Sequence, residues 1–370
     1  MKFRRVRAMA RKEFLHIVRV TRSLVMALLV PLFMLVLFGY ALSLDVDHIP
    51  TLVVDHDRTP ASRDLRARFE GTPFFEVLGV ESSTALVDRE IDRGRVLLAV
   101  VIPAGFDRDL ARGQRPAVQL LLDGSDSNTA SIAINYAQTL ILTWAGERAA
   151  GRRVTPPAEA QVRVMYNSDL KSRNFLIPGL IAVVLMIIAA LLTSLTIARE
   201  WENGSMEQLL STPLRPAEIV LGKLIAYFAI GAVDVVTSVL MGVFVFDVPL
   251  RGNLLFLGFS SALFLFGALS WGILISAIAK TQLLAYQMGM LSSFLPAFLL
   301  SGFMYSIENM PRPIQVVSSI VPARYFITIL KAVYLKGEGM QLLWMQVLFL
   351  AIYGAVVFAL ATRKIGHKVA

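Results

Sequence analysis

The chain lacks cysteine altogether and is poor in charge and histidine. Without Cys among its 370 residues, disulfide bonds, thiolate metal sites and thiol catalysis are excluded. Only 17% of the residues are charged and 56% are hydrophobic, a composition that predicts several membrane spans rather than a soluble domain. The four histidines are scattered, with no HExxH motif and no pairing at metal-ligand spacing. We therefore expect no metal or cofactor in this chain.

A motif for nucleotide hydrolysis is also missing. The single Gly-Lys dipeptide, at 222–223, lacks the preceding glycine of the P-loop pattern GxxxxGK[ST] and runs into an apolar stretch. The sequence thus predicts a protein that is not an enzyme, and any chemical energy it uses has to come from a partner.

Six apolar stretches reach the roughly 20 residues that a helix needs to cross a membrane. Deep inside them lies one ionisable side chain, Asp234, which is either a functional intramembrane polar site or a carboxyl group that bonds a neighbouring helix. The predicted spans are Ser23–Leu44, Asn174–Ala198, Leu224–Phe246, Asn253–Ala279, Thr281–Ile307 and Met340–Thr362.

The net charge of +9 is concentrated beside the membrane. Residues 1–22 are rich in Lys and Arg with a single acid, Glu13, whereas residues 45–173 carry both signs in similar number. This distribution follows the positive-inside rule and excludes a nucleic-acid footprint, so both termini are expected in the cytoplasm. Residues 1–22 fit a basic amphipathic helix on the inner surface, although an ordinary positive flank would explain the charges equally well.

Residues 45–173 form a soluble α/β domain inserted after the first span. Short apolar runs at 51–55, 74–80, 96–102 and 117–123 predict strands, and helices are expected at 60–70, 84–93, 104–112 and 127–146. Three of these helices end at a glycine, at positions 71, 94 and 113, where a left-handed cap is expected. Such alternation predicts a mostly parallel sheet covered by helices.

A charged strip at 199–223 separates the second and third spans. Within it, GSMEQLLS predicts a short amphipathic helix that Pro213 closes, with Met206, Leu209 and Leu210 on an apolar face. The alternative is a solvated loop. A second unusual segment, 311–336, has apolar pieces too short to span and broken by proline, which predicts re-entrant helices.

The chain resembles the permease subunits of type-2 ABC exporters, in the multidrug-efflux branch that carries a large periplasmic domain. The stretches that match, in the expected order, are RKEFLHIVRVTRSLVMALLVPLFMLVLFGYAL, VVDHDRTPASRDL, LLLDGSDSNTASIAINYA, YNSDLKSRNFLIPGLIA, REWENGSMEQLLSTPLRPAEIVLGKLIAY and VPARYFITILKAVYLKG.

This resemblance implies a fold, a location and partners. The fold would have six transmembrane helices, a periplasmic α/β domain at 45–173 and re-entrant helices at 311–336, in a bacterial inner membrane. Residues 1–22 would be the connecting helix and 199–213 the coupling helix, which contacts a separate ATP-binding subunit that uses ATP and Mg. The residues implied in that coupling are Glu200, Glu202, Gly204, Met206, Glu207, Leu209, Leu210 and Pro213.

Further partners follow from the same resemblance. They are a second permease half (the same chain or a paralogue) and a periplasmic adaptor with an outer-membrane channel. The predicted function is ATP-driven export of hydrophobic or amphiphilic compounds, drugs or lipids. The alternatives are a membrane sensor or assembly scaffold with a periplasmic ligand-binding domain and an ion-coupled transporter, for which the spans offer a single acid and no repeat.

Overall fold

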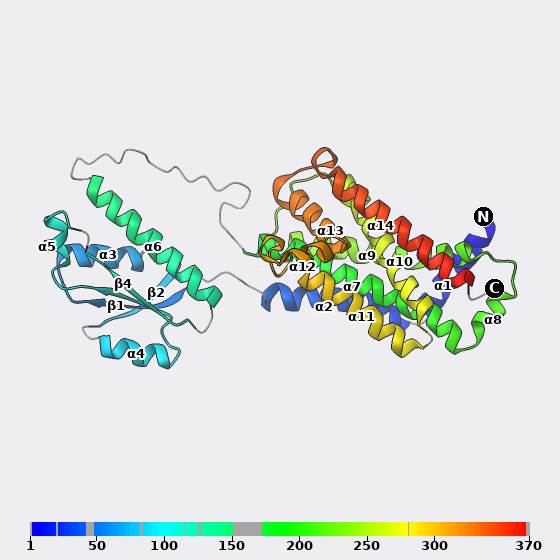
Figure 1. Cartoon of the computed structure of the whole chain (residues 1–370), viewed down its shortest axis with the longest axis horizontal. Helices are drawn as coiled ribbons and strands as arrows, with labels where there is room; N and C mark the ends of the chain where they lie inside the picture. Colours follow the sequence, from blue (N-terminus) through cyan, green and yellow to red (C-terminus); the bar gives the residue numbers. More distant parts are fainter. Residues whose placement is uncertain are drawn as a thin grey trace. The chain divides into compact units, whose positions relative to one another are not determined.

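The computed structural model of the chain describes residues 2–19, 21–41, 48–81, 84–114, 116–124, 127–150, 172–279 and 281–367. The chain forms two compact units (Figure 1). The helical unit comprises Met1–Ser43 and Val164–Ala370, and the α/β unit comprises Leu44–Arg163. The sequence also predicts a linker at 151–157 and a strand at 161–167; both lie within residues 151–171, outside the described residues.

The α/β unit contains a mostly parallel four-stranded sheet, as expected. Its strand order is β2-β1-β3-β4, and only β4 runs antiparallel to its neighbour. The elements in chain order are β1 (Ile49–Asp55), α3 (Pro60–Glu70), β2 (Phe75–Glu81), α4 (Thr84–Asp92), β3 (Leu98–Ile102), α5 (Phe106–Ala111), β4 (Gln119–Leu122) and α6 (Ser127–Ala150).

Both faces of this sheet are buried, because successive side chains of a strand point to opposite sides. In β1, Val53 packs with α3 and α6 on one face, whereas Val54 packs with α4 on the other (Figure 1). Gly94 and Gly113 adopt the left-handed conformation after their helices, with φ of 67° and 74°. The expectation of a left-handed cap was wrong for Gly71: its φ is −86°, because its N–H bonds the Ala67 carbonyl and continues the helical pattern.

The helical unit is built mainly from long apolar helices, with four short elements before its last helix. Its helices in chain order are α1 (Phe3–Arg19), α2 (Thr21–Ala41), α7 (Ser172–Glu202), α8 (Ser205–Leu210), α9 (Pro216–Phe244), α10 (Leu254–Ile278), α11 (Gln282–Leu299), η1 (Ile307–Asn309), α12 (Arg312–Ser318), α13 (Pro322–Lys331), η2 (Ala332–Lys336) and α14 (Met340–His367).

Six spans were predicted, but fewer helices of the described residues have the length and composition of a full span. In the described part of the chain, four do: α7, α9, α10 and α14. A fifth is reached if α12 and the continuous α13–η2 segment count as one span, but they meet at a bend of 80°, in the segment where re-entrant helices are predicted. The predicted fifth span was too long, since α11 ends at Leu299 and the chain then turns at Gly302, whose φ is 82°.

Helix α7 is the central helix of this unit. It contacts α2, α9, α10, α11 and α13 and is buried around most of its circumference, as a helix that is apolar on every side must be (Figure 1). Against α10, the Thr193 hydroxyl donates a hydrogen bond of 2.9 Å to the Leu269 carbonyl oxygen. One turn further along α10, Gly272 lies against Ala190 and Thr193 with no room for a Cβ. Small residues at such a crossing let two backbones approach closely.

This close approach makes the α7–α10 packing sensitive to one methyl group. We expect Gly272→Ala to destabilise the unit by about 1–3 kcal/mol, the usual cost of overpacking a core. The matched control is Gly258→Ala in the same helix, where a Cβ would meet nothing within 4 Å. Thermal unfolding in detergent compares the two variants. Equal melting temperatures would show that the α7–α10 contact at Gly272 is not tightly packed.

Candidate functional site

The short helix α8 lies between the ends of two long helices. Helix α7 continues through the beginning of the charged strip to Glu202, and the chain reverses at Gly204, whose φ of 69° is the left-handed conformation that glycine adopts without strain. Helix α8 then covers Ser205–Leu210, and Pro216 opens α9. The predicted helix is therefore present, although residues 199–202 belong to α7.

The apolar side of α8 is used inside the molecule. Met206 is 1% exposed and belongs to the core of the helical unit, and Leu209 packs against the same core. Glu207 and Gln208 are exposed on the other side. The helix is thus anchored by its methionine and presents a polar surface, where the sequence had suggested an apolar surface for a partner.

Of the remaining residues predicted for coupling, three lie beside α8 in the chain and contact other helices. The Glu202 carboxylate accepts a 2.8 Å hydrogen bond from the backbone N–H of Gln282, where α11 begins. The Pro213 carbonyl accepts a hydrogen bond from Arg5 of α1. Glu200 faces α1 and α9 as described below, and Leu210 is the last residue of α8.

Helix α1 packs along the first turns of α9. The Lys2 backbone N–H donates a 2.8 Å hydrogen bond to Glu218, and Arg5 lies 3.8 Å from the same carboxylate. Further along, Met9 packs against Gly222, where a Cβ would come within 2.6 Å of the methionine side chain. Among the apolar residues of α1, Val6, Met9 and Ile17 are buried, whereas Phe3, Phe14 and Val18 are exposed.

A buried ion cluster connects α1, α7 and α9. The Lys223 ammonium group, whose side chain is 1% exposed, lies 3.1 Å from a Glu13 oxygen and 2.9 Å from a Glu200 oxygen. Lys12 reaches the same two oxygens at 3.2 and 3.0 Å from a half-exposed position. Two cations and two anions therefore compensate one another. Breaking such a cluster by removing one charge is costly, because another is left buried and unpaired.

Sequence analysis missed three members of this cluster: Lys12, Glu13 and Lys223. A signal was available for Glu13, since it lies on the helical stripe formed by Val6, Met9 and Ile17 and is the only acid in that segment. A lone acid among buried positions requires a cation nearby. Nothing local indicates that this cation is Lys223, which follows 210 residues later.

The charges of the cluster set the ionisation of Glu13. Burial alone would raise the pKa of this carboxyl group, but Lys223 and Lys12 together lower it below its ordinary value of 4.5. Burial would likewise lower the pKa of Lys12, but Glu200 and Glu13 raise it.

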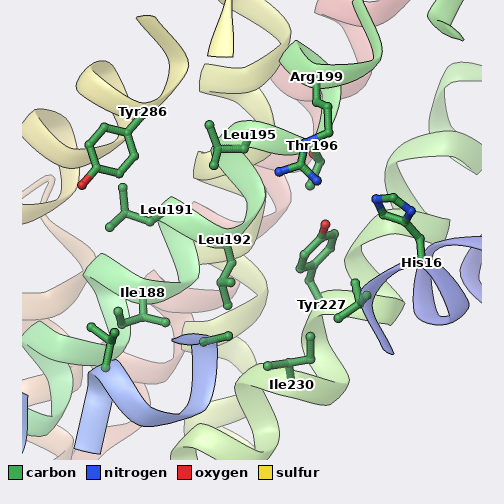
Figure 2. Close-up of a pocket in the computed structure, with 13 residues that line it drawn as sticks. His16, Ile188, Leu191, Leu192, Leu195, Thr196, Arg199, Tyr227, Ile230 and Tyr286 are labelled. Atoms are coloured by element: carbon green, nitrogen blue, oxygen red, sulfur yellow. The ribbon is translucent and has the colours of Figure 1, made fainter. Parts of the chain in front are cut away.

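A cavity of about 360 Å³ opens beside the cluster, among α1, α2, α7, α9 and α11. Its apolar end is lined by Ile188, Leu192 and Ile230, and its polar end by Thr196, Arg199 and the Tyr227 hydroxyl (Figure 2). A smaller crevice of about 230 Å³ adjoins the polar end and reaches the ion cluster.

Asp234 is buried in the middle of α9. It is 1% exposed, and neither carboxylate oxygen has a hydrogen-bond partner among the described residues. The Ser238 hydroxyl, one turn further on the same helix, also lacks a partner there. Within the described ranges, no group of three or more His, Asp or Glu side chains is arranged to hold a metal ion.

Comparison with known proteins identifies the family. The model of the ABC-2 family transporter proteins matches residues 21–363, and the chain belongs to this family. It is a type-2 ABC permease, the membrane-spanning subunit of an ABC transporter, and such a permease implies an ABC ATP-binding partner.

Curated relatives cover nearly the whole chain. The chain is 37% identical over 361 residues to the probable multidrug ABC transporter permease YbhS of Escherichia coli, covering 97% of this chain and 95% of YbhS. It is 31% identical to the probable multidrug ABC transporter permease YbhR of the same organism, covering 98% and 100%. The inner membrane transport permease YhhJ of E. coli is 30% identical over 326 residues, covering 85% and 84%.

The ion cluster provides two lysines in very different surroundings. We expect Lys223→Met to destabilise the helical unit by about 3–5 kcal/mol, because Glu13 and Glu200 would stay buried with less compensating charge. Lys12→Met removes the same charge from a side chain that is 52% exposed, and should cost far less. Thermal unfolding of the purified variants compares the two, and a similar loss in both would refute the buried role of Lys223.

The lowered pKa of Glu13 predicts a dependence of stability on pH. The stabilisation from its ionised form is complete above its ordinary pKa of 4.5 and is lost as the pH falls through the lower value of the folded state. We expect the melting temperature of the wild-type chain to fall through this acidic range more steeply than that of Glu13→Gln. If the melting temperatures of the two proteins fell in parallel with pH, ionised Glu13 would not be the source of this pH dependence.

Proposed function

We propose that the chain exports hydrophobic or amphiphilic compounds across the bacterial inner membrane, driven by a separate ATP-binding subunit that docks on α8. The main support for this proposal is the geometry of α8. This short helix is anchored by Met206 and exposes Glu207 between the ends of α7 and α9. ATP and Mg belong to the partner subunit. The names of YbhS and YbhR, both probable multidrug permeases, support drugs as cargo.

In this proposal, α8 transmits the closure of the ATP-binding subunits to the membrane helices. Glu200 and Lys223 connect the ends of α7 and α9 to each other and to α1, and Glu202 connects α7 to the start of α11. A force on α8 therefore moves the cytoplasmic ends of four helices together. Buried ion pairs can transmit this movement, because separating their two charges costs much of the interaction energy.

The proposed topology has six spans: α2, α7, α9, α10, α11 and α14. Both termini and α8 are cytoplasmic, and the α/β unit and the bent α12–α13 pair are periplasmic, the pair being re-entrant. Helix α1 is the connecting helix, and its exposed Phe3, Phe14 and Val18 enter the headgroup region. The basic residues of 1–22 and the positive-inside rule support this orientation.

Export requires a second permease half, either the same chain or a paralogue. The substrate leaves between α7 and α11, the second and fifth spans, and the α/β unit passes it to a periplasmic adaptor and an outer-membrane channel. Asp234 is proposed as an intramembrane polar site, on the ground that its buried oxygens have no partner in the described chain.

Reversing one exposed charge on α8 tests the coupling. We expect Glu207→Lys to lower the affinity for the ATP-binding subunit about tenfold, roughly 1.4 kcal/mol, because a complementary contact becomes repulsive. Drug-stimulated ATP hydrolysis should fall with it, while membrane insertion and melting temperature stay unchanged. The affinity for the ATP-binding subunit and the drug-stimulated ATP hydrolysis are both measured in proteoliposomes that contain the assembled complex.

The control is Glu308→Lys, an exposed glutamate of η1 outside the proposed contact. Leu209→Lys is less diagnostic, because Leu209 packs on the core and its loss also destabilises the permease. If hydrolysis and assembly in Glu207→Lys equal those of the control, α8 is not the docking element.

A further inference from the structure

The cavity among α1, α2, α7, α9 and α11 has an apolar half and a polar half. Ile188, Leu192 and Ile230 surround one half, and the polar groups gather at the other (Figure 2). There, Arg199 and the Tyr227 hydroxyl project toward the same space, with His16 across from them. A ligand that fits both halves has an apolar body and a polar end, as in most ligand pockets, where a few polar groups fix the orientation.

The polar half carries an excess of positive charge. The adjoining crevice contains Lys12 and Lys223, but Glu13 and Glu200 compensate both. Arg199 differs, because no carboxylate of the described residues lies within ion-pair distance of it. Arg199 instead donates a 3.3 Å hydrogen bond from its Nε to the neutral Gln282 side-chain oxygen.

The terminal nitrogens of Arg199 are therefore available in the polar half of the cavity. The guanidinium group has five N–H donors in a planar fork that matches a carboxylate or phosphate, and one of them is used by Gln282. The Tyr227 side chain is 8% exposed, and its hydroxyl can donate a further hydrogen bond to an anion at the same place.

We propose that this cavity binds an anionic amphiphile with one apolar tail, its anionic group on Arg199 and Tyr227 and its tail along Ile188, Leu192 and Ile230. At about 360 Å³ the cavity lies near the lower end of the range of ligand pockets, which suits one tail rather than two. The inference rests on the proposed export function, to which it adds the charge of a substrate class.

The position of Arg199 also connects this cavity to the coupling element. It precedes Glu200 of the ion cluster directly, and its Nε contact reaches Gln282 at the start of α11. An anion on Arg199 would thus be bound one residue away from the group that joins α7 to α1 and α9.

Binding to the purified full-length chain in zwitterionic nanodiscs tests the proposal directly. The probes are laurate, lauryl alcohol and dodecyltrimethylammonium, which share a 12-carbon chain and differ in charge, at concentrations that leave the bilayer intact. We expect laurate to bind best. Arg199→Gln should weaken laurate about tenfold to a hundredfold, the usual effect of losing a hydrogen bond to a charged group, and leave lauryl alcohol nearly unchanged.

Three variants complete the design. Arg199→Lys keeps the charge and should retain part of the preference for laurate. Leu192→Trp fills the apolar half and should weaken laurate and lauryl alcohol together. Arg363→Gln removes an exposed arginine of α14 that does not line the cavity, and should change nothing. A parallel titration with lysophosphatidylglycerol distinguishes a lipid-derived anion from a free acid by which of the two binds more tightly.

Equal affinity for the anionic and cationic probes would overturn the proposal, as would unchanged laurate binding in Arg199→Gln. Neither result depends on the ATP-binding subunit, so the two proposals fail separately. If the assembled complex exports drugs in a Glu207-dependent manner while Arg199→Gln binds laurate normally, the export function stands and the anionic site does not.

Discussion

The burial of the Lys223 ammonium group between Glu13 and Glu200 is the constraint on which the α1–α7–α9 end of the helical unit depends. An ammonium ion is expensive to remove from water, so its two carboxylates have to stay in place. They belong to α1 and α7, and the lysine belongs to α9. Three helices are therefore held in one register, and α8, which connects two of them, is fixed at both ends.

The sequence predicts most of the elements because their signals are local. Helix α3 covers the predicted Pro60–Glu70, since Thr59 and Ser62 form a capping box and Pro60 occupies the first turn. The strands of the α/β unit and the short helix α8 are predicted from similarly local signals. The errors come from tertiary context: α11 ends early at a turn, and the cap at Gly71 is right-handed because its N–H still finds a helical partner.

The candidate site was only partly predictable. Periodicity finds Met206 and Leu209 on one face of α8, but it does not tell whether that face meets a partner or the protein's own core, and in the structure it meets the core. Glu200 was assigned to a contact outside the chain from the family resemblance. Its role inside the ion cluster depends on Lys12 and Lys223, which are distant in sequence and become neighbours only through packing.

The long separation of Glu13 and Lys223 along the chain also sets an order of assembly. Helix α1 leaves the ribosome first, and the lysine follows 210 residues later, after the α/β unit and α7 have been made. In that interval Lys12 is the cation closest in sequence to Glu13, so the Glu13 carboxylate has one of its two cations. The cluster can therefore close only after α9 has been synthesised.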